Sequence, residues 1–290
     1  MTTVRAPAKV NLTLHVTGRR DDGYHLLDSL VGFADIGDMV SVVPAPDLSL
    51  TVSGPFSIGV PRDGSNLVLR AARALQQARG VRVGARLKLD KHLPSAGGIG
   101  GGSSDAAATL ALLAQVWQVD PLDPGSPEVL ALGADVPVCM GQPAARRMSG
   151  IGDVLAPVPP LPDTALVLVN PKVPVATADV FARLATRENP AMDPLPEGLD
   201  FDAFVGWLGR QRNDLLAPAR EVAPEIARCL DKLSALPQVR FAGMSGSGAT
   251  CFGLCRTMAD ARQAARAMQV AAMSWWVAPA EMLQTSRATT

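Results

Sequence analysis

The sequence predicts an α+β fold in two halves, a β-rich amino-terminal half and a mixed carboxy-terminal half. Apolar and β-branched residues recur at every second position over 4–16 and 38–52, which is the pattern of strands. A run of glycines at 97–102 leads into a segment rich in alanine and leucine, which favours a helix. Prolines cluster at 157–162, and we expect the boundary between the halves there.

The first half continues with one helix, one strand and a second helix. The segment 66–79 carries an apolar stripe at helical spacing, so we expect a helix there. A strand is expected at 83–89, before the glycine run. The second helix is expected to begin after Ser104, in the sequence DAAATLALLAQVW.

The second half is predicted to contain both strands and helices. Strands are expected at 165–170, 239–243 and 249–254. Helices are expected at 177–186, 200–217, 221–235 and 258–271.

Length and composition are typical of a folded protein with more than one domain. The chain has 290 residues, of which 48% are hydrophobic and 19% charged, so neither a disordered nor a collagen-like chain is expected. Lys and Arg together number 27, as do Asp and Glu, which removes the basic excess that binding to nucleic-acid phosphates requires. The sequence therefore predicts no nucleic-acid partner.

The beginning of the chain, MTTVRAPAKVNLTLHV, lacks the features of a secretory signal, and no apolar run approaches the roughly 20 residues of a membrane-spanning helix. We therefore expect a cytoplasmic chain without a membrane partner. The histidines show no paired spacing for a zinc site, and the cysteines are expected to be buried free thiols. The oligomeric state, a homodimer included, stays open.

The glycine run is the strongest candidate for a ligand site. Its glycines free the backbone to adopt positive φ and to expose several N–H groups, which form a nest for an anion. A helix that starts directly after the loop adds unpaired N–H groups and the positive end of its dipole. The loop has neither the Gly-Lys-Ser/Thr of a Walker A motif nor the spacing of a dinucleotide site. A nucleotide phosphate is the expected occupant, and a flexible connection is the alternative.

Three blocks of the sequence together resemble the GHMP small-molecule kinases. They are PAKVNLTLHVTGRRDDGYH at 7–25, LPSAGGIGGGSSDAA at 93–107 and GMSGSGATCFG at 243–253. The first block and LGADVP at 132–137 are similar in particular to the branch of this family that acts on a cytidine-diphosphate-linked methylerythritol. We expect the third block to place a second glycine turn beside the first loop; a tight connection between two strands is the alternative. Ser95 and Ala96 stand where the family commonly has Met and Gly.

The resemblance implies a two-domain GHMP-kinase fold. Its amino-terminal half, 1–160, would be ribosomal S5 domain 2-like and bind ATP, and its carboxy-terminal half, 161–290, would be ferredoxin-like and bind the substrate. The implied reaction uses ATP and Mg²⁺ to phosphorylate the 2-hydroxyl of 4-diphosphocytidyl-2-C-methyl-D-erythritol, in the non-mevalonate route to isoprenoid precursors. Direct in-line transfer is expected, because no His, Cys or Asp is placed as a phosphate carrier.

Lys9 and Asp135 match the catalytic pair of the family. A carboxylate can accept the proton of the attacking hydroxyl, and a nearby ammonium keeps that carboxylate ionised and neutralises developing charge. The resemblance therefore implies that Asp135 is the general base and that Lys9 is its partner. The alternatives are a surface lysine on a strand and an aspartate that caps a helix or forms a turn.

The resemblance also implies residues that contact the nucleotide. Asn66 and Lys91 align with residues near the adenine. The phosphate-binding loop would consist of Pro94, Ser95, Ala96, Gly97, Gly98, Ile99, Gly100, Gly101, Gly102, Ser103 and Ser104. Ser103 or Ser104 could also reach Mg²⁺, while no acidic residue is assigned as a metal ligand.

On the substrate side, Tyr24 is the only tyrosine of the chain and His25 follows it directly. The resemblance implies that this pair meets the cytosine, with Phe181 as a second stacking ring and Asn11 beside the reacting polyol. The alternative is that Tyr24 and His25 pack a loop and that Phe181 belongs to a core.

Two other functions remain open at this point. Another GHMP kinase, acting on mevalonate, homoserine or a sugar, would share the loop and the base but would need no cytosine pocket. A non-catalytic relative that senses ligands would be expected to have lost its base, whereas Asp135 is present.

Overall fold

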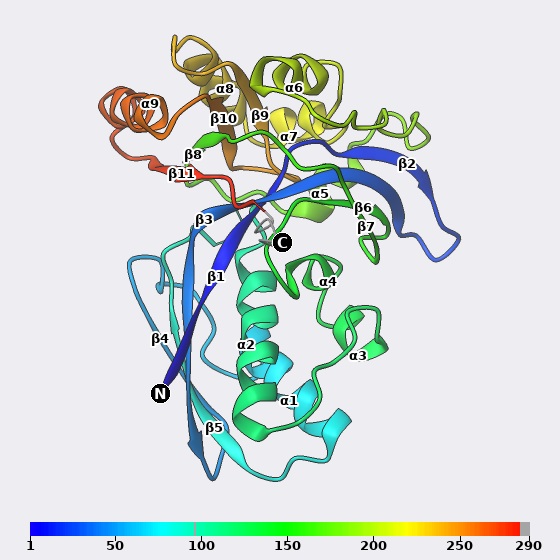
Figure 1. Cartoon of the computed structure of the whole chain (residues 1–290), viewed down its shortest axis with the longest axis vertical. Coiled ribbons are helices and arrows are strands. Elements are labelled where there is room, and N and C mark those ends of the chain that lie inside the picture. Colours follow the sequence, from blue (N-terminus) through cyan, green and yellow to red (C-terminus); the bar gives the residue numbers. More distant parts are fainter. Residues whose placement is uncertain (96, 285–290) are drawn as a thin grey trace. The chain divides into compact units, whose positions relative to one another are not determined.

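The computed structural model describes residues 1–95 and 97–284 (Figure 1). The chain forms two compact units. The first contains 1–8, 36–95 and 100–142, and the second contains the described residues of 9–35, 96–99 and 143–290. Strands β1 (Thr2–Asn11) and β3 (His25–Ala45) contribute to both units. The division at residue 160 into an ATP-binding and a substrate-binding domain concerns function and stays a prediction.

The first unit packs two helices on a group of strands. The second part of β3 pairs antiparallel with β5 (Gly84–Asp90), and β4 (Ser49–Ser53) lies parallel to β5. Helices α1 (Leu67–Arg79) and α2 (Gly101–Trp117) lie against each other and share a core with these strands (Figure 1). Two single-turn helices, α3 (Pro127–Leu130) and α4 (Val136–Cys139), follow α2.

The predicted helix at 66–79 is confirmed as α1. Asn66 caps it, because its side chain accepts a hydrogen bond from the amide of Val68 at 2.9 Å. Helix α2 begins at Gly101, earlier than the predicted start after Ser104. Glycine has a weak helix propensity, so the early start depends on packing around this turn rather than on its own sequence.

The core of the second unit lies on a four-stranded antiparallel sheet. Its order is β11 (Trp276–Glu281), β8 (Ala165–Asn170), β10 (Cys251–Cys255) and β9 (Phe241–Met244). Every residue of β8 and β10 is buried, as expected for central strands. Helices α8 (Glu225–Ser234) and α9 (Met258–Ala271) pack against these strands (Figure 1).

The second unit also holds the first part of β3 and the strands that pair with it. These are β2 (His15–Arg19) and β6 (Arg146–Gly150), and β6 in turn pairs with β7 (Val154–Pro157). Helices α5 (Thr177–Ala182), α6 (Phe201–Leu208) and α7 (Leu216–Val222) complete it.

The single helix predicted at 200–217 is wrong, because α6 and α7 are separate helices. Asn213, in the segment between them, forms an isolated β-bridge with Leu14, and the amide of Leu14 donates to the carbonyl of Arg212 at 2.8 Å. The side chain of Asn213 donates to two carbonyls of the 243–248 turn, those of Met244 and Gly246. These contacts between residues far apart in the sequence outweigh the local helix propensity.

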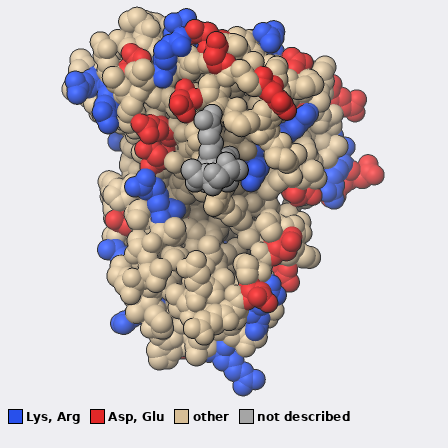
Figure 2. Space-filling view, viewed as in Figure 1, with Lys and Arg blue, Asp and Glu red and all other residues tan. Residues whose placement is uncertain are grey.

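Among residues 1–95 and 97–284, no helix combines the length and the apolar character needed to cross a membrane. Figure 2 shows one face of the molecule, on which Lys and Arg side chains are interspersed with Asp and Glu. The predicted α+β character is confirmed by the two groups of strands and the helices that cover them.

Candidate active site

The glycine loop has the backbone geometry that an anion nest requires. Gly98 and Gly100 adopt φ angles of 73° and 62°, in the left-handed region that glycine enters readily. Gly100 stands at the N-cap of α2, and no side chain of the described residues caps that helix. Because the first amides of a helix lack partners within it, the start of α2 can donate hydrogen bonds to an anion.

The turn at 243–248 packs against the glycine loop within the second unit, as the sequence predicts. The hydroxyl of Ser245 donates to the carbonyl of Gly98 at 2.8 Å, and the amide of Thr250 donates to the carbonyl of Gly97 at 3.0 Å. A Cβ atom added to Gly98 would lie only 2.5 Å from the carbonyl oxygen of Ser245. The close approach of these two backbones therefore requires glycine at position 98.

Lys9 is buried, with 3% of its surface exposed, so it is not the surface lysine of the alternative interpretation. Its ammonium donates to Oδ1 of Asn11 at 2.9 Å. Its amide donates to the carbonyl of Ile99, and the amide of Asn11 donates to the hydroxyl of Ser245 at 3.0 Å. Within the second unit, β1 thus joins Lys9 and Asn11 to the glycine loop and to the 243–248 turn.

Asp135 lies in the first unit, at the residue before α4. Its side chain is partly exposed and accepts no capping hydrogen bond from the first turn of α4, residues 136–138. The helix-cap interpretation is therefore not supported for this carboxylate, whereas the turn interpretation fits its position, because the amide of Val136 donates to the carbonyl of Gly133 at 3.0 Å.

His25 and Phe181 meet in the second unit. Their rings stack with centroids 4.7 Å apart and an angle of 28° between the planes. Burial, followed by the positive charges of Arg19 and Arg187, lowers the pKa of His25, which favours a neutral ring. Its Nε2 atom is buried and has no hydrogen-bond partner among the described residues. Tyr24, the next residue along the chain, is 57% exposed.

Two predicted nucleotide residues have partners in the protein. Asn66 is buried and caps α1, and its amide group also donates to the carbonyl of Pro61 at 2.6 Å. The ammonium of Lys91 is buried between two carboxylates, described below. A contact of either residue with a nucleotide stays a prediction.

The predicted loop runs from Pro94 to Ser104, and Ala96 lies outside the described residues. The two serines at its end differ in exposure. Ser104 is buried and its hydroxyl donates to the carbonyl of Pro7 at 2.7 Å, whereas Ser103 is partly exposed. Of the two, Ser103 is therefore the better placed to reach a ligand.

A buried ion-pair cluster, Asp38–Lys91–Asp105, lies beneath the start of α2 in the first unit. The Lys91 ammonium donates to Oδ2 of Asp38 and, at 3.0 Å, to Oδ2 of Asp105. Oδ1 of Asp38 accepts the amides of His92 and Leu93 at 2.6 and 2.9 Å. A Cβ atom on Gly101 would lie 3.4 Å from the ammonium, so the first turn of α2 rests on this cluster.

The Asp38–Lys91–Asp105 cluster holds two carboxylates and one ammonium. Burial raises the pKa of Asp105 to about 7, against the opposing attraction of Lys91. Burial lowers the pKa of Lys91, but the two carboxylates outweigh it and the net shift is upward. Sequence reasoning missed the pairing, because no spacing along the chain links a strand, a loop and a helix of the first unit.

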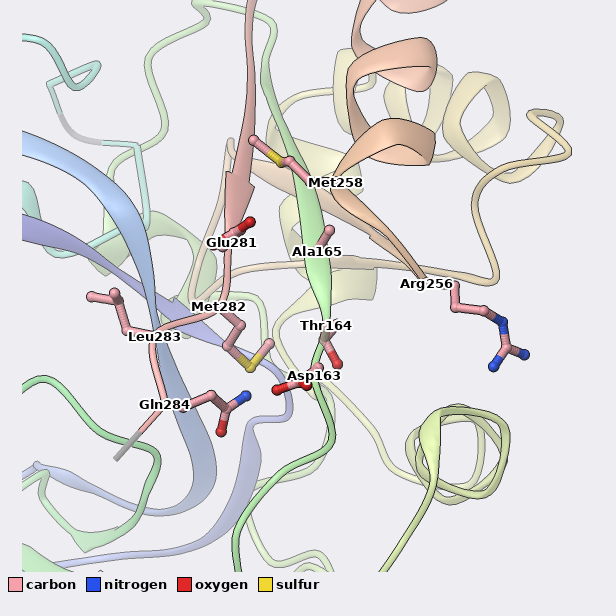
Figure 3. A pocket seen from close by; sticks show the side chains of 9 residues that line it. All are labelled: Asp163, Thr164, Ala165, Arg256, Met258, Glu281, Met282, Leu283 and Gln284. Atoms are coloured by element: carbon pink, nitrogen blue, oxygen red, sulfur yellow. The ribbon is translucent and has the colours of Figure 1, made fainter. Parts of the chain in front are cut away.

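A separate hollow of about 490 Å³ lies in the second unit, near the start of β8 and the end of β11 (Figure 3). It is lined by Asp163, Thr164, Ala165, Arg256, Met258, Glu281, Met282, Leu283 and Gln284. None of the predicted site residues lines it, so it is not part of the candidate active site.

Two family models and several known proteins match this chain. Residues 66–157 match the model of the GHMP kinases N terminal domain, and residues 200–273 match that of the GHMP kinases C terminal domain. The 4-diphosphocytidyl-2-C-methyl-D-erythritol kinase of Cereibacter sphaeroides (strain ATCC 17029 / ATH 2.4.9) is 54% identical over 98% of this chain and 100% of its own. The protein of the same name from Jannaschia sp. (strain CCS1) is 54% identical over 96% of this chain and 96% of its own.

A solved structure of a 4-(cytidine 5'-diphospho)-2C-methyl-D-erythritol kinase is similar throughout. It matches with a TM-score of 0.79 and 32% identity, over 98% of this chain and 100% of that chain. The predicted two-domain GHMP-kinase fold is thereby confirmed. The chain belongs to the 4-diphosphocytidyl-2-C-methyl-D-erythritol kinase family of the GHMP kinase superfamily.

Proposed function

We propose that the protein transfers the γ-phosphate of ATP to the 2-hydroxyl of 4-diphosphocytidyl-2-C-methyl-D-erythritol, in the non-mevalonate route to isoprenoid precursors. The observation that carries the proposal is the set of hydrogen bonds that joins Lys9 and Asn11 to the glycine loop through Ser245. A catalytic ammonium and a phosphate-binding loop are thus parts of one bonded arrangement. The relatives named above, which match over nearly the whole chain, support the choice of acceptor.

ATP is proposed to bind with its phosphates at the start of α2. The amides that follow Gly100 and the positive end of the helix dipole would hold them. Pro94, Ser95 and the glycines of the loop would line this site, with Asn66 and Lys91 nearer the adenine. In this proposal the domain 1–160 binds ATP and the domain 161–290 binds the substrate.

Asp135 is proposed as the general base and Lys9 as its charge partner. As the acceptor hydroxyl attacks the γ-phosphorus, its proton passes to the Asp135 carboxylate, the new P–O bond forms and ADP leaves. The buried Lys9 ammonium would keep that carboxylate ionised and would offset negative charge on the reacting oxygens. Asn11, bonded to the ammonium, would lie beside the polyol.

Mg²⁺ fits this site as a companion of the triphosphate. Among residues 1–95 and 97–284, no group of three or more His, Cys, Asp or Glu side chains is arranged to hold a metal. Mg²⁺ commonly keeps several waters and binds phosphate oxygens, so the triphosphate and water would supply most of its ligands, and the hydroxyl of the partly exposed Ser103 is the protein donor that we propose. When bound, the ion would neutralise charge on the phosphates.

The cytosine is proposed to bind at the stacked pair of His25 and Phe181, with Tyr24 as a further ring. A neutral imidazole with an unpaired Nε2 can form a hydrogen bond with the edge of a base, and the exposed tyrosine can cover its face. A mevalonate, homoserine or sugar kinase would not need these groups. A cytoplasmic location stays a prediction, and a homodimer stays open.

The test is an ADP-release assay with Mg²⁺-ATP and a set of acceptors. It compares 4-diphosphocytidyl-2-C-methyl-D-erythritol with its fragment 2-C-methyl-D-erythritol 4-phosphate, and with mevalonate, homoserine and galactose. We expect turnover with the intact cytidine substrate and little with the fragment, because the fragment lacks the base. Turnover with mevalonate, homoserine or galactose instead would refute the proposed acceptor. If none of the acceptors supports ADP release, the result would favour a ligand-sensing protein.

A further inference from the structure

Beyond Lys9 and Asn11, the structure contains a buried serine that touches neither the loop nor Lys9 directly. Ser29 lies on β3 and is fully buried. Its Oγ accepts a hydrogen bond from Nδ2 of Asn11 at 2.8 Å and donates to the carbonyl of Thr13 at 2.5 Å. The chain of hydrogen bonds therefore runs from Lys9 through Asn11 and Ser29 to the backbone, all within the second unit.

The chemistry of these groups fixes which partner donates in each hydrogen bond of this series. A backbone carbonyl can only accept, so the Ser29 hydroxyl must donate its one hydrogen to Thr13. The Ser29 oxygen is then left as an acceptor, and only the NH₂ side of the Asn11 amide can satisfy it. Oδ1 of Asn11 must consequently face the Lys9 ammonium, which can only donate.

We propose that Ser29 is a positioning residue for phosphoryl transfer: by fixing which way the Asn11 amide points, it sets the position of the Lys9 ammonium. The inference rests on the proposed catalytic role of Lys9. Without the Ser29 hydroxyl, the NH₂ group of Asn11 loses its buried acceptor, and the amide is held only from its Oδ1 side, so it can rotate away from its position. The Asn11 oxygen that the ammonium bonds to then moves with the amide, and small displacements of a group in the site are costly to the rate.

The main test is the variant Ser29→Ala. We expect kcat to fall about tenfold or more, because a small misplacement of a group at the reacting atoms is costly to the rate, with little change in the KM for ATP. In an Asn11→Ala background the same substitution should cause no further loss, because Ser29 acts only through Asn11. If Ser29→Ala lowers kcat by the same factor in the wild type and in the Asn11→Ala background, the inference is overturned.

Two further variants separate positioning from simple packing. Ser29→Thr keeps the hydroxyl and should retain a kcat close to that of the wild type, whereas Ser29→Cys keeps the size but not the strong donor and should resemble Ser29→Ala. If Ser29→Ala does not fold, the Thr and Cys variants decide the question. Equal kcat values for those two variants would overturn the inference.

Ser41→Ala is the matched control. Ser41 is a second buried serine on β3, and its hydroxyl bonds to the hydroxyl of Thr3 at 2.8 Å; both belong to the first unit, whereas Ser29, Lys9 and Asn11 belong to the second. We expect the wild-type kcat in this variant, so a loss equal to that of Ser29→Ala would count against positioning.

Lys9→Ala distinguishes a failure of this inference from a failure of the proposed function. If Lys9→Ala keeps full activity, the proposed role of Lys9 is wrong and the inference falls with it. If Lys9→Ala is inactive while folded Ser29→Ala has the wild-type kcat, only the inference about Ser29 is wrong.

Discussion

Asp135 and Lys9 differ in their surroundings in a way that suits their proposed roles. Asp135 is partly exposed, so an acceptor hydroxyl can approach it. The ammonium of Lys9 is buried and bonded to Asn11. A base that must receive a proton needs access, and a fixed cation needs a position held by its neighbours.

The variant Asp135→Asn tests the base directly. An amide cannot accept the hydroxyl proton, so we expect kcat to fall by about 10²-fold or more with an almost unchanged affinity for ATP. Steady-state ADP release and ATP titration measure the two quantities. Asp231→Asn, at an exposed carboxylate of α8, is the control and should behave as the wild type. Unaltered turnover in Asp135→Asn would remove Asp135 from this role.

Individual site residues were predictable from the sequence where they lie in recognisable motifs. Lys9, Asn11, His25 and Phe181 were named in this way, and the structure joins the first two by a hydrogen bond and the last two by stacking. The partners that hold them were not predictable. Asn11 bonds to Ser29 and Ser245, which lie 18 and 234 residues away, and no local pattern indicates such pairs.

At the scale of elements, the glycine loop is held through its own carbonyls, which accept hydrogen bonds from the Ser245 hydroxyl and from the amides of Thr250 and Lys9. The 243–248 turn and the loop approach so closely that a methyl group at position 98 has no room. This contact was expected from the resemblance of the two segments to blocks of the GHMP kinases. The sequence did not predict that α2 would begin inside the loop, at Gly101, where it rests on the Asp38–Lys91–Asp105 cluster.

The variant Gly98→Ala should disrupt the loop. The added Cβ would lie 2.5 Å from the carbonyl oxygen of Ser245 and 2.7 Å from that of Gly248, at a φ of 73°. We expect a large rise in the KM for ATP. Gly80→Ala has a similar strained φ, 65°, at the end of α1, but nothing lies within 4 Å of its added Cβ. It should cost about 1 kcal/mol of stability and leave the KM for ATP unchanged. Equal KM values in the two variants would contradict the account.

Longer elements were predicted where periodicity is strong and missed where burial is uniform. The helices at 66–79 and 258–271 were placed correctly. The first part of β3 was missed because all of residues 28–34 are buried. Such a strand lacks the alternation of apolar and polar residues that marks a strand with one exposed face. The α6–α7 break was missed because Leu14 and the 243–248 turn, both far away in the sequence, determine it.

At the scale of the whole molecule, the Asp38–Lys91–Asp105 cluster makes the free energy of unfolding depend on pH. Between its usual pKa of 3.8 and about 7, Asp105 in the folded chain keeps a proton that the unfolded chain has released. Its contribution to the free energy of unfolding therefore falls as pH rises through this window and is constant above it.

The variant Asp105→Asn checks this linkage by thermal unfolding. Asparagine does not titrate, so the Tm of the wild type should decline relative to that of the variant as pH rises from about 4 to about 7, and the difference should then level off. Tm curves that stay parallel over the whole window would show that Asp105 is ionised throughout.

The position of the new phosphate tests the central claim most directly. Carbon 2 of the substrate carries a methyl group and no hydrogen, so a phosphate on its hydroxyl has no proton on the ester carbon. After complete reaction with ATP and 4-diphosphocytidyl-2-C-methyl-D-erythritol, we predict a phosphomonoester signal in proton-coupled phosphorus NMR without splitting from an ester-carbon proton. A signal split by such protons would place the phosphate on another hydroxyl and contradict the account, as would the absence of a new phosphomonoester.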